Sequence, residues 1–338
     1  MVHEEYEGVI IHNVEPLEEA FPPTRLWHRD GQRDEIAFYL KPALKNRPIR
    51  NLYIYGPPGT GKTCLIKWIL ENYFEEIAAY VNCFRFRTTR EILKEVLFKF
   101  GYIAKESEQN SDLFKKLEEI TKKKRIIICL DEVDQIKESD KDEVLYNLVD
   151  LRVGLILISN RLPTQLYTLD PRTRDRLNLH DIEFPEYKLN ELIDIGIDRR
   201  NLAFVPGTFP DSMVQLAAEH SEGDARLLLL IMRNAGRIAE QRNAKKVEEQ
   251  DVMKGVLEAK RLRKSKLLEK LNEHQKIIYS ILEQKRRMPA GELFRTYCKQ
   301  VKNHVEARTF RLYMFHMCAL GLTKAIGAKK WRVYEIVI

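Results

Sequence analysis

A glycine-rich segment at residues 56–63 holds the clearest chemistry in the sequence. It reads GPPGTGKT, follows the apolar run LYIY and is followed at once by a helical pattern. Glycines there let backbone N–H groups surround a phosphate at a helix N-terminus, while the lysine and threonine would reach the β- and γ-phosphates and Mg²⁺. We therefore expect a site for ATP or ADP with Mg²⁺. The expected nucleotide contacts are Gly56, Pro57, Pro58, Gly59, Thr60, Gly61, Lys62, Thr63 and Cys64, with Thr63 also a metal ligand.

Two adjacent carboxylates follow a second apolar run, RIIICL. Asp131 and Glu132 would end a buried strand, where charged groups are costly unless they have a function. Asp131 suits a direct or indirect ligand of Mg²⁺, and Glu132 suits the residue that orients and deprotonates an attacking water. The alternative is a pair of ordinary strand-end acids. Asp134 is interpreted as a surface or capping acid.

Further polar residues follow the next apolar run, VGLILIS. Asn160 would lie at the carboxyl edge of the sheet, where its amide could hold the attacking water near the γ-phosphate. Beyond it, Arg172, Arg174 and Arg176 form a cluster that could offer an arginine to the γ-phosphate on a neighbouring subunit. Arg176 is the first choice because it directly precedes Leu177 and the final strand. The alternative is a solvated basic loop.

The elements that would position these residues alternate between strands and helices. Short apolar runs separated by helical stretches indicate parallel strands covered on both faces, which gives an α/β sandwich to about residue 185. From residue 189 to about 258 the spacing is helical, and three further helices with a hairpin form a winged helix-turn-helix pattern. The strand runs are LYIY, AAYVNC, RIIICL, VGLILIS and the weaker DIEF. The expected domains are 1–187 for nucleotide binding, 188–262 for a helical lid and 263–338 for the winged helix.

Charge is distributed unevenly along the 338 residues. The segment from Lys254 to the end holds 20 Lys and Arg against 7 Asp and Glu, or +13, so with a total of +7 the first 253 residues carry −6. A basic module attached to an acidic body is typical of nucleic-acid binding, although a solvated basic face is the alternative. The apolar runs are far shorter than a membrane helix and the first residues do not resemble a signal peptide. These features predict a cytoplasmic protein without a membrane partner.

The third helix of the C-terminal pattern is the expected contact with double-stranded DNA. Side chains near the start of such a helix can reach base edges or phosphates in the major groove, and a wing can reach phosphates or the minor groove. A stripe of Phe310, Met314 and Met317 on the same helix fits core packing instead. The predicted DNA contacts are Arg308, Thr309 and Arg311 on the helix, Lys329 and Lys330 at the tip of the wing, and Arg332 on its strand.

The order and spacing of these motifs resemble the archaeal origin recognition complex subunit one / cell division control protein six initiators, a branch of the AAA+ ATPases. The resemblance runs from about residue 22 to the end. It rests on the glycine-rich segment at residues 56–63, which is a P-loop, and on motifs along the rest of the chain. These are PPTRLWHRDGQRDEIAFYLKPAL, YVNC, LDEVD, DEVLYNLV, ISN, LDPR, FPEYKLNELIDIGIDRRNLAF, GDARLLLLIMRNAGRIAE and the terminal helices. It implies an α/β AAA+ P-loop ATPase whose parallel sheet is sandwiched by helices, with an all-helical lid and a C-terminal winged-helix domain.

The resemblance also implies roles for residues outside the P-loop. Tyr187 and Arg199 would contact the nucleotide from the lid boundary, and Arg29 would lie beside the adenine. Arg226, in the segment GDAR, would be the sensor-2 arginine that detects the γ-phosphate. Taken alone, Arg226 would be a helix-surface residue, since most arginines are. The glycine and aspartate before it suit the turn and the N-cap of its helix.

Residues and resemblance together imply an ATP-dependent replication initiator. Slow Mg²⁺-dependent hydrolysis would serve as a switch, and the winged helix would bind origin duplex DNA. Other initiator protomers and the replicative minichromosome maintenance helicase would be its protein partners. Two alternatives stay open at this point: an AAA+ branch-migration motor, and a DNA-binding regulator that keeps ATP as a structural ligand without significant hydrolysis.

Overall fold

The computed structural model describes residues 9–19, 21, 26–151, 153–164, 169–327 and 331–337. The chain divides into two compact units, residues 1–247 and residues 248–338. The first unit contains the expected nucleotide-binding domain and most of the expected lid. The second unit, called the terminal unit below, contains the expected winged helix.

The centre of the first unit is a parallel sheet of five described strands in the order β2-β3-β4-β1-β5. β1 lies between β4 and β5, so its carboxyl end is flanked on both sides by other strand ends. The five predicted strand runs are confirmed, with boundaries shifted by one or two residues. The strands are β1 Asn51–Tyr55, β2 Ala78–Asn82, β3 Ile127–Asp131, β4 Gly154–Ser159 and β5 Leu179–Glu183.

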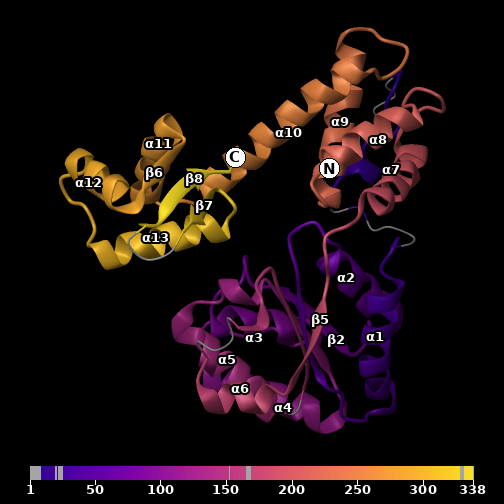
Figure 1. The fold of residues 1–338 in the computed structure, drawn as a ribbon. Coiled ribbons are helices and arrows are strands. Elements are labelled where there is room, and N and C mark those ends of the chain that lie inside the picture. The colour runs from indigo at the N-terminus through magenta and orange to yellow at the C-terminus, as the bar shows by residue number, and fades with distance from the viewer. Residues whose placement is uncertain are drawn as a thin grey trace. The chain divides into compact units, whose positions relative to one another are not determined.

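Helices cover both faces of this sheet, as the apolar runs predict (Figure 1). Alternate strand residues point to opposite faces, so each face supplies one core. α1 and α2 pack on one face over residues such as Ile54 and Ile156, and the other helices pack on the opposite face over residues such as Leu130 and Leu157. The helices are α1 Asp30–Leu40, α2 Lys62–Tyr73, α3 Thr89–Lys99, α4 Asn110–Lys123, α5 Glu138–Asp150 and α6 Pro171–Leu177, with short 3-10 helices at Lys41–Lys45 and Val133–Gln135. Another 3-10 helix, Glu15–Leu17, belongs to the N-terminal segment and contacts α7 (Leu189–Ala203) and α9 (Ala225–Gln241).

The lid helices of the first unit follow the sheet, as predicted. α9 begins at the predicted N-cap, because the Asp224 carboxylate accepts hydrogen bonds from the backbone N–H groups of Arg226 and Leu227 at 2.9 and 3.2 Å. Its apolar residues form the core of the lid. The helices are α7 Leu189–Ala203, α8 Asp211–Glu219 and α9 Ala225–Gln241.

An N-terminal strap, residues 9–19, packs on the lid, which the sequence analysis did not anticipate. The backbone N–H groups of Ile10 and Ile11 donate to Glu240 Oε1 at 3.1 and 3.0 Å, and Ile11 forms a β-bridge with Phe204. Both isoleucines are buried, with 0% and 1% exposure. The lid is therefore built from both ends of the first unit.

The terminal unit begins with a single helix, α10, over Glu249–Glu269. The charged run at residues 260–270 continues this helix, so the expected boundary at residue 262 falls within α10. Lysine and arginine are good helix formers, which explains why the run stays helical. Among the described residues, no helix is both long enough and apolar enough to cross a membrane.

The rest of the terminal unit has the winged-helix elements that the sequence predicts, with one strand more. Short β6 pairs with β8, so the expected hairpin becomes a three-stranded antiparallel sheet in the order β6-β8-β7. β6 was missed because its three residues are too few to show an alternating pattern. The elements are α11 Glu273–Lys285, β6 Arg287–Pro289, α12 Ala290–Gln300, α13 Ala307–Ala319, β7 Thr323–Ile326 and β8 Val333–Ile336.

Candidate nucleotide site and nucleic-acid interface

The carboxyl edge of the parallel sheet brings the predicted catalytic segments together. Tyr55 on β1 pairs with Ser159 on β4, so the residues that follow them, Gly56 and Asn160, lie at the same level. Asp131 ends β3 on the other side of β4. Three motifs that are distant in sequence thus share one edge, where ligands bind in open α/β sheets.

The P-loop leaves the start of α2 free for an anion. Gly61 is the N-cap residue, has a left-handed backbone with φ of 89°, and offers no side chain to the first N–H groups of the helix. Lys62 is 5% exposed, and its Nζ donates to the carbonyl oxygens of Gly56 and Pro57, each at 2.7 Å. Burial, and then the charge of Arg226, lower the pKa of Lys62 to about 8.

Two of the P-loop glycines are required by close packing. A Cβ at Gly56 would lie 2.1 Å from the carbonyl oxygen of Phe184. A Cβ at Gly59 would lie 1.7 Å from Asp224 Oδ1, and the backbone N–H of Ala225 donates to the Gly59 carbonyl at 3.2 Å. The lid helix α9 therefore begins directly on the P-loop.

Asp131 is the centre of the hydrogen-bond network at this edge. The Thr63 hydroxyl and the Tyr80 hydroxyl donate to Asp131 Oδ2 at 2.7 and 2.6 Å, and the backbone N–H of Glu132 donates to Oδ1 at 2.8 Å. Asp131 is 2% exposed. Hydroxyl and carboxylate oxygens in this pairing are ligands that suit Mg²⁺. The residues present therefore fit the ion that the P-loop implies.

Tyr80 is a site residue that the sequence analysis missed. It lies on β2, next to β3 in the sheet, and its alignment with Asp131 depends on the register between those two strands. Burial and the Asp131 carboxylate raise the pKa of the Tyr80 hydroxyl, so it stays protonated and keeps donating. The signal in the sequence was the tyrosine in AAYVNC, two residues before the strand end.

Glu132 and Asn160 take positions consistent with their predicted roles, which stay predictions. Glu132 has φ of 53°, in the left-handed region that costs a non-glycine residue free energy. Backbone strain of this kind often occurs at functional sites. Asn160 directly follows β4 and is exposed. Asp134, interpreted above as a surface or capping acid, is instead largely buried and accepts from Ser159 Oγ at 2.8 Å.

Arg29 links the P-loop to the lid boundary. Its guanidinium donates to the carbonyl oxygens of Thr60 at 3.0 Å and Pro185 at 2.7 Å, and it stacks on the Tyr187 ring at 3.8 Å from the centroid. A Cβ at Gly61 would lie 2.8 Å from the Tyr187 hydroxyl oxygen. Arg29 and Tyr187 thus lie against the P-loop. That Arg29 lies beside the adenine and that Tyr187 contacts the nucleotide remain predictions.

Arg199 is a buried cation at the same boundary. It is 8% exposed, lies over the Phe21 ring at 4.9 Å, and its charge acts on the Cys64 thiol, the P-loop residue after Thr63. Within the described residues, its Nη1 has no hydrogen-bond partner. An unsatisfied buried donor is costly, so this atom fits a group supplied by a ligand.

Arg226 lies on the exposed surface of α9 beside the phosphate site. Its guanidinium forms an ion pair with Glu19 of the N-terminal strap at 2.7 Å, and it contributes to the lowered pKa of Lys62. The two positive charges are therefore near each other. The role of Arg226 as a γ-phosphate sensor remains a prediction.

The arginine cluster forms the helix α6. Arg176 pairs with Asp150 at 2.9 Å and lies over the Tyr146 ring, whereas Arg172 is exposed and Arg174 pairs weakly with Asp175 at 3.8 Å. The cluster is thus a helix and no basic loop. Which arginine would act on a neighbouring subunit remains a prediction.

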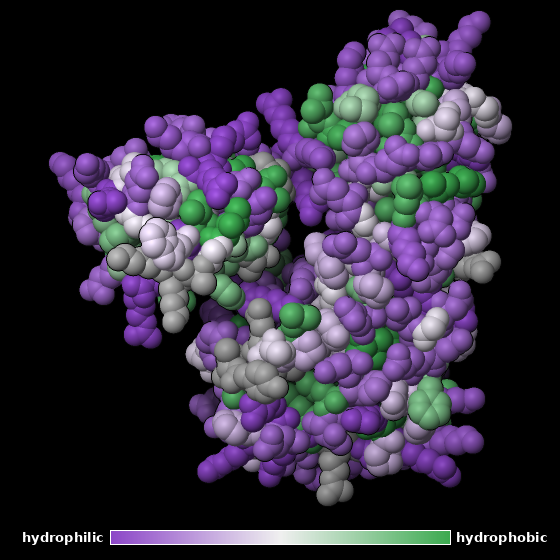
Figure 2. All heavy atoms as spheres, in the orientation of Figure 1, coloured by the Kyte–Doolittle hydropathy of each residue, from purple (hydrophilic) through white to green (hydrophobic). Residues whose placement is uncertain are grey.

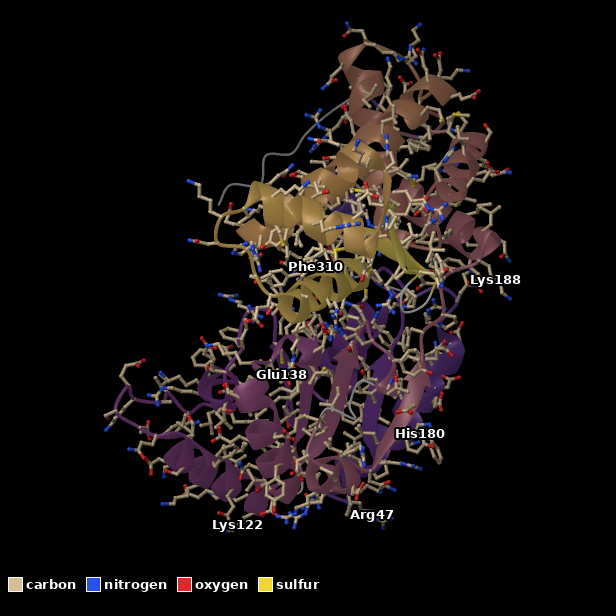
Figure 3. The ribbon with its side chains drawn as sticks, turned by 60° about the vertical axis from the view of Figure 1, so that its left-hand side comes forward. Arg47, Lys122, Glu138, His180, Lys188 and Phe310 are labelled. Atoms are coloured by element: carbon tan, nitrogen blue, oxygen red, sulfur yellow. The ribbon has the colours of Figure 1, made fainter. Side chains whose placement is uncertain are left out.

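The terminal unit presents the predicted recognition helix, α13. Phe310, Met314 and Met317 are buried at 3%, 0% and 0%, which confirms their packing in the core; Figure 3 labels Phe310. Arg308 and Arg311 are exposed on the other face. Thr309 is half-buried, and Arg332 is exposed one residue before β8, not on the strand as expected. Lys329 and Lys330 lie outside the described residues.

Several known proteins are similar to this chain. Residues 47–165 match the AAA domain family, and residues 193–256 match the Cdc6 AAA+ ATPase-type lid domain. The ORC1-type DNA replication protein of Thermococcus kodakarensis is 32% identical over 319 residues, covering 85% of this chain and 76% of that protein. ORC1-type DNA replication protein 9 of Halobacterium salinarum is 27% identical, covering 97% and 94%. The solved structure of the Aeropyrum pernix ORC1 protein in complex with DNA has a TM-score of 0.78 at 26% identity, covering 98% of this chain and 94% of that one.

Proposed function

This chain belongs to the ORC1-type family of archaeal DNA replication initiators, and on that premise we propose that it is an ATPase switch that binds origin duplex DNA. In its ATP state the initiator would associate with other initiator protomers and help recruit or load the replicative minichromosome maintenance helicase. The family membership favours this function over a branch-migration motor and over a regulator without hydrolysis.

The observation that carries the ATPase assignment is the hydrogen bond between Thr63 and Asp131 beside the uncapped start of α2. Mg²⁺ held by these two residues would offset negative charge on the β- and γ-phosphates. Lys62 would leave its two carbonyl partners and bind the same phosphates. Glu132 would accept a proton from the attacking water while the Asn160 amide orients that water.

The position of the lid would depend on whether ATP or ADP is bound, because α9 contacts the P-loop. Because Ala225 and Asp224 contact the P-loop backbone, a phosphate in that loop changes the surface on which the lid rests. Arg226 would exchange its ion pair with Glu19 for the γ-phosphate. Hydrolysis removes that phosphate, so the lid position differs between the ATP and ADP states.

A Glu132→Gln substitution tests the ATPase assignment. It keeps the side-chain shape but removes the base, so hydrolysis should fall by a factor of about 10² or more while ATP binding stays near wild type. Single-turnover hydrolysis and fluorescent-ATP titration measure the two quantities. Glu138→Gln, at an exposed glutamate that begins α5 (Figure 3), is the matched control and should change neither. Unchanged turnover in the Glu132 variant would remove that residue from its proposed role.

Arg308→Ala tests the assignment of α13 to duplex DNA. Loss of one phosphate contact should weaken binding. It should also make the negative slope of log affinity against log salt less steep, by about 0.9. Fluorescence anisotropy over a salt series gives that slope. Lys276→Ala on α11, where the lysine pairs with Glu273, is the control and should leave the slope unchanged. Equal salt slopes for wild type and the Arg308 variant would contradict a contact between Arg308 and phosphate.

A further inference from the structure

The outward face of α13 carries two large apolar side chains next to its arginines. Leu312 is 61% exposed and Phe315 is 59% exposed, on a helix whose opposite face is fully packed. Residues three and four positions apart share one face of a helix, so this pair forms a continuous stripe with Arg308 and Arg311. Figure 2 shows apolar residues reaching the surface of the terminal unit among polar ones.

The core of the terminal unit does not explain the two apolar side chains. Phe310, Met314 and Met317 already supply the inward contacts of α13. Single exposed apolar residues are common on protein surfaces, but a leucine and a phenylalanine side by side leave a contiguous apolar patch in water. Such a patch on a helix fits a partner that buries it.

The arginines on the same stripe indicate what kind of partner this is. Arg308 and Arg311 are exposed, and the surrounding segment is strongly basic, so the complementary partner is a polyanion. A major groove admits one α-helix between two rows of phosphates, and the apolar group displayed on its floor is the C5-methyl group of thymine. A stripe with arginines and apolar side chains together matches both features of that groove.

We propose that Leu312 and Phe315 contact thymine methyl groups in the major groove while Arg308 and Arg311 contact phosphates or base edges. α13 would therefore select duplex sites with thymine beneath its apolar stripe. This inference rests on the proposed function, duplex binding through α13, and adds to it a specificity that comes from methyl groups instead of hydrogen bonds.

Deoxyuridine provides a direct test, because it lacks the C5-methyl group and keeps the hydrogen-bonding edges of thymine. The probe is the duplex that the full chain selects from a random-sequence pool, prepared once with thymine and once with deoxyuridine throughout the protected site. Wild type should bind the deoxyuridine duplex about four-fold more weakly for each methyl group contacted, the effect of exposing one buried hydrocarbon carbon. Leu312→Ala and Phe315→Ala should bind the thymine duplex more weakly and respond less to methyl removal.

In a double-mutant cycle, the affinities of wild type and of each alanine variant are compared on the thymine and the deoxyuridine duplex. A direct contact makes the two losses non-additive, whereas an effect of methyl removal on DNA shape alone is the same for wild type and variant. Leu257→Ala on α10 is the matched control, since Leu257 is 69% exposed in the same unit. It should keep the full preference for thymine. Because Leu312 and Phe315 are exposed, their alanine variants should keep the wild-type circular dichroism spectrum and melting temperature.

Three outcomes would overturn the inference, and they are distinguishable from failure of the proposed function. Equal wild-type affinity for the two duplexes would show that no methyl group is contacted. A preference for thymine that survives in both alanine variants would place the methyl contact elsewhere. Wild-type DNA affinity in both variants would show that Leu312 and Phe315 do not contact the duplex. Absence of any duplex binding by the full chain would instead contradict the proposed function itself.

Discussion

Lys62 combines burial with positive charge at the P-loop. Its ammonium group donates to two backbone carbonyls and lies near the Arg226 guanidinium, and burial lowers its pKa to about 8. A polyphosphate placed beside it would favour the charged form and raise the pKa again. Nucleotide binding should therefore be coupled to proton uptake by this one side chain.

The coupling predicts how nucleotide affinity depends on pH. Below pH 8 Lys62 is already protonated, so no proton is taken up. Above pH 8 the free protein loses the proton that the complex keeps, so affinity should fall by up to about tenfold per pH unit. Calorimetry near pH 9 in buffers with different ionisation enthalpies should show uptake of nearly one proton. Lys62→Arg, whose guanidinium stays charged, should show almost none, and equal uptake in both proteins would assign the proton to another group.

At the residue scale, the sequence predicted those site residues that belong to short motifs. Lys62, Thr63 and Asp131 were predicted because a P-loop and a strand-end carboxylate are local patterns with a defined chemistry. Tyr80 was not predicted, because its contact with Asp131 depends on which strand lies beside β3. The ion pair of Arg226 with Glu19 was not predicted, because it joins two segments about 200 residues apart that only the fold brings together.

At the scale of elements, the N-terminal strap is a structural part of the lid. Its two buried isoleucines and its hydrogen bonds to Glu240 join it to α7 and α9. A Cβ at Gly236 on α9 would lie 2.8 Å from Ile11 Cδ1, which shows how closely the strap packs. The lid therefore depends on residues that lie about 200 positions before it in the sequence.

Ile11→Ala should destabilise the lid by about 2–5 kcal/mol, the usual cost of truncating a buried isoleucine. Hydrogen exchange in α7 and α9 should accelerate while exchange in β3 changes little, because the sheet core does not contact the strap. Val9→Ala is the control, since Val9 is 73% exposed in the same segment. Unchanged exchange in the lid of the Ile11 variant would show that the strap contributes no stability there.

Elements with a clear local pattern in the sequence, either a continuous apolar run or a helical period, were predicted, and those without such a pattern were not. The parallel strands are continuous apolar runs, and α9 has apolar residues at helical spacing after a Gly-Asp start, so both were recognisable. β6 has three residues and no period, and the strap is extended and pairs with lid residues far along the chain. The expected boundary at residue 262 falls within α10, because the charged run consists largely of good helix formers and extends the helix.

At the scale of the whole molecule, the arginines of α6 bear on assembly. Arg176 must break its ion pair with Asp150 to reach a neighbouring subunit, and an exposed pair of this kind costs only about 0–1 kcal/mol to separate. Arg176 therefore remains our choice for an arginine that acts in trans.

Mixing two inactive variants tests action in trans. Arg176→Ala keeps its own Glu132, and Glu132→Gln keeps its own Arg176, so each variant alone should be slow while a mixture recovers part of wild-type hydrolysis. Turnover measured against mixing ratio gives the result. The same mixture with Arg172→Ala or Arg174→Ala should behave as wild type diluted with Glu132→Gln. Recovery of activity only with one of those two arginines would reassign the role.

The strap also has a consequence for how the chain is made. Ile10 leaves the ribosome long before its partner Glu240, which is 230 residues further along. At roughly 5–20 residues per second, that separation corresponds to about 10–50 s of translation. Throughout this interval two isoleucines that are fully buried in the finished protein have no native surface to cover them. The lid can therefore be completed only after nearly the whole first unit has been synthesised, and the strap, which is made before the sheet and the lid helices, packs in place only after them.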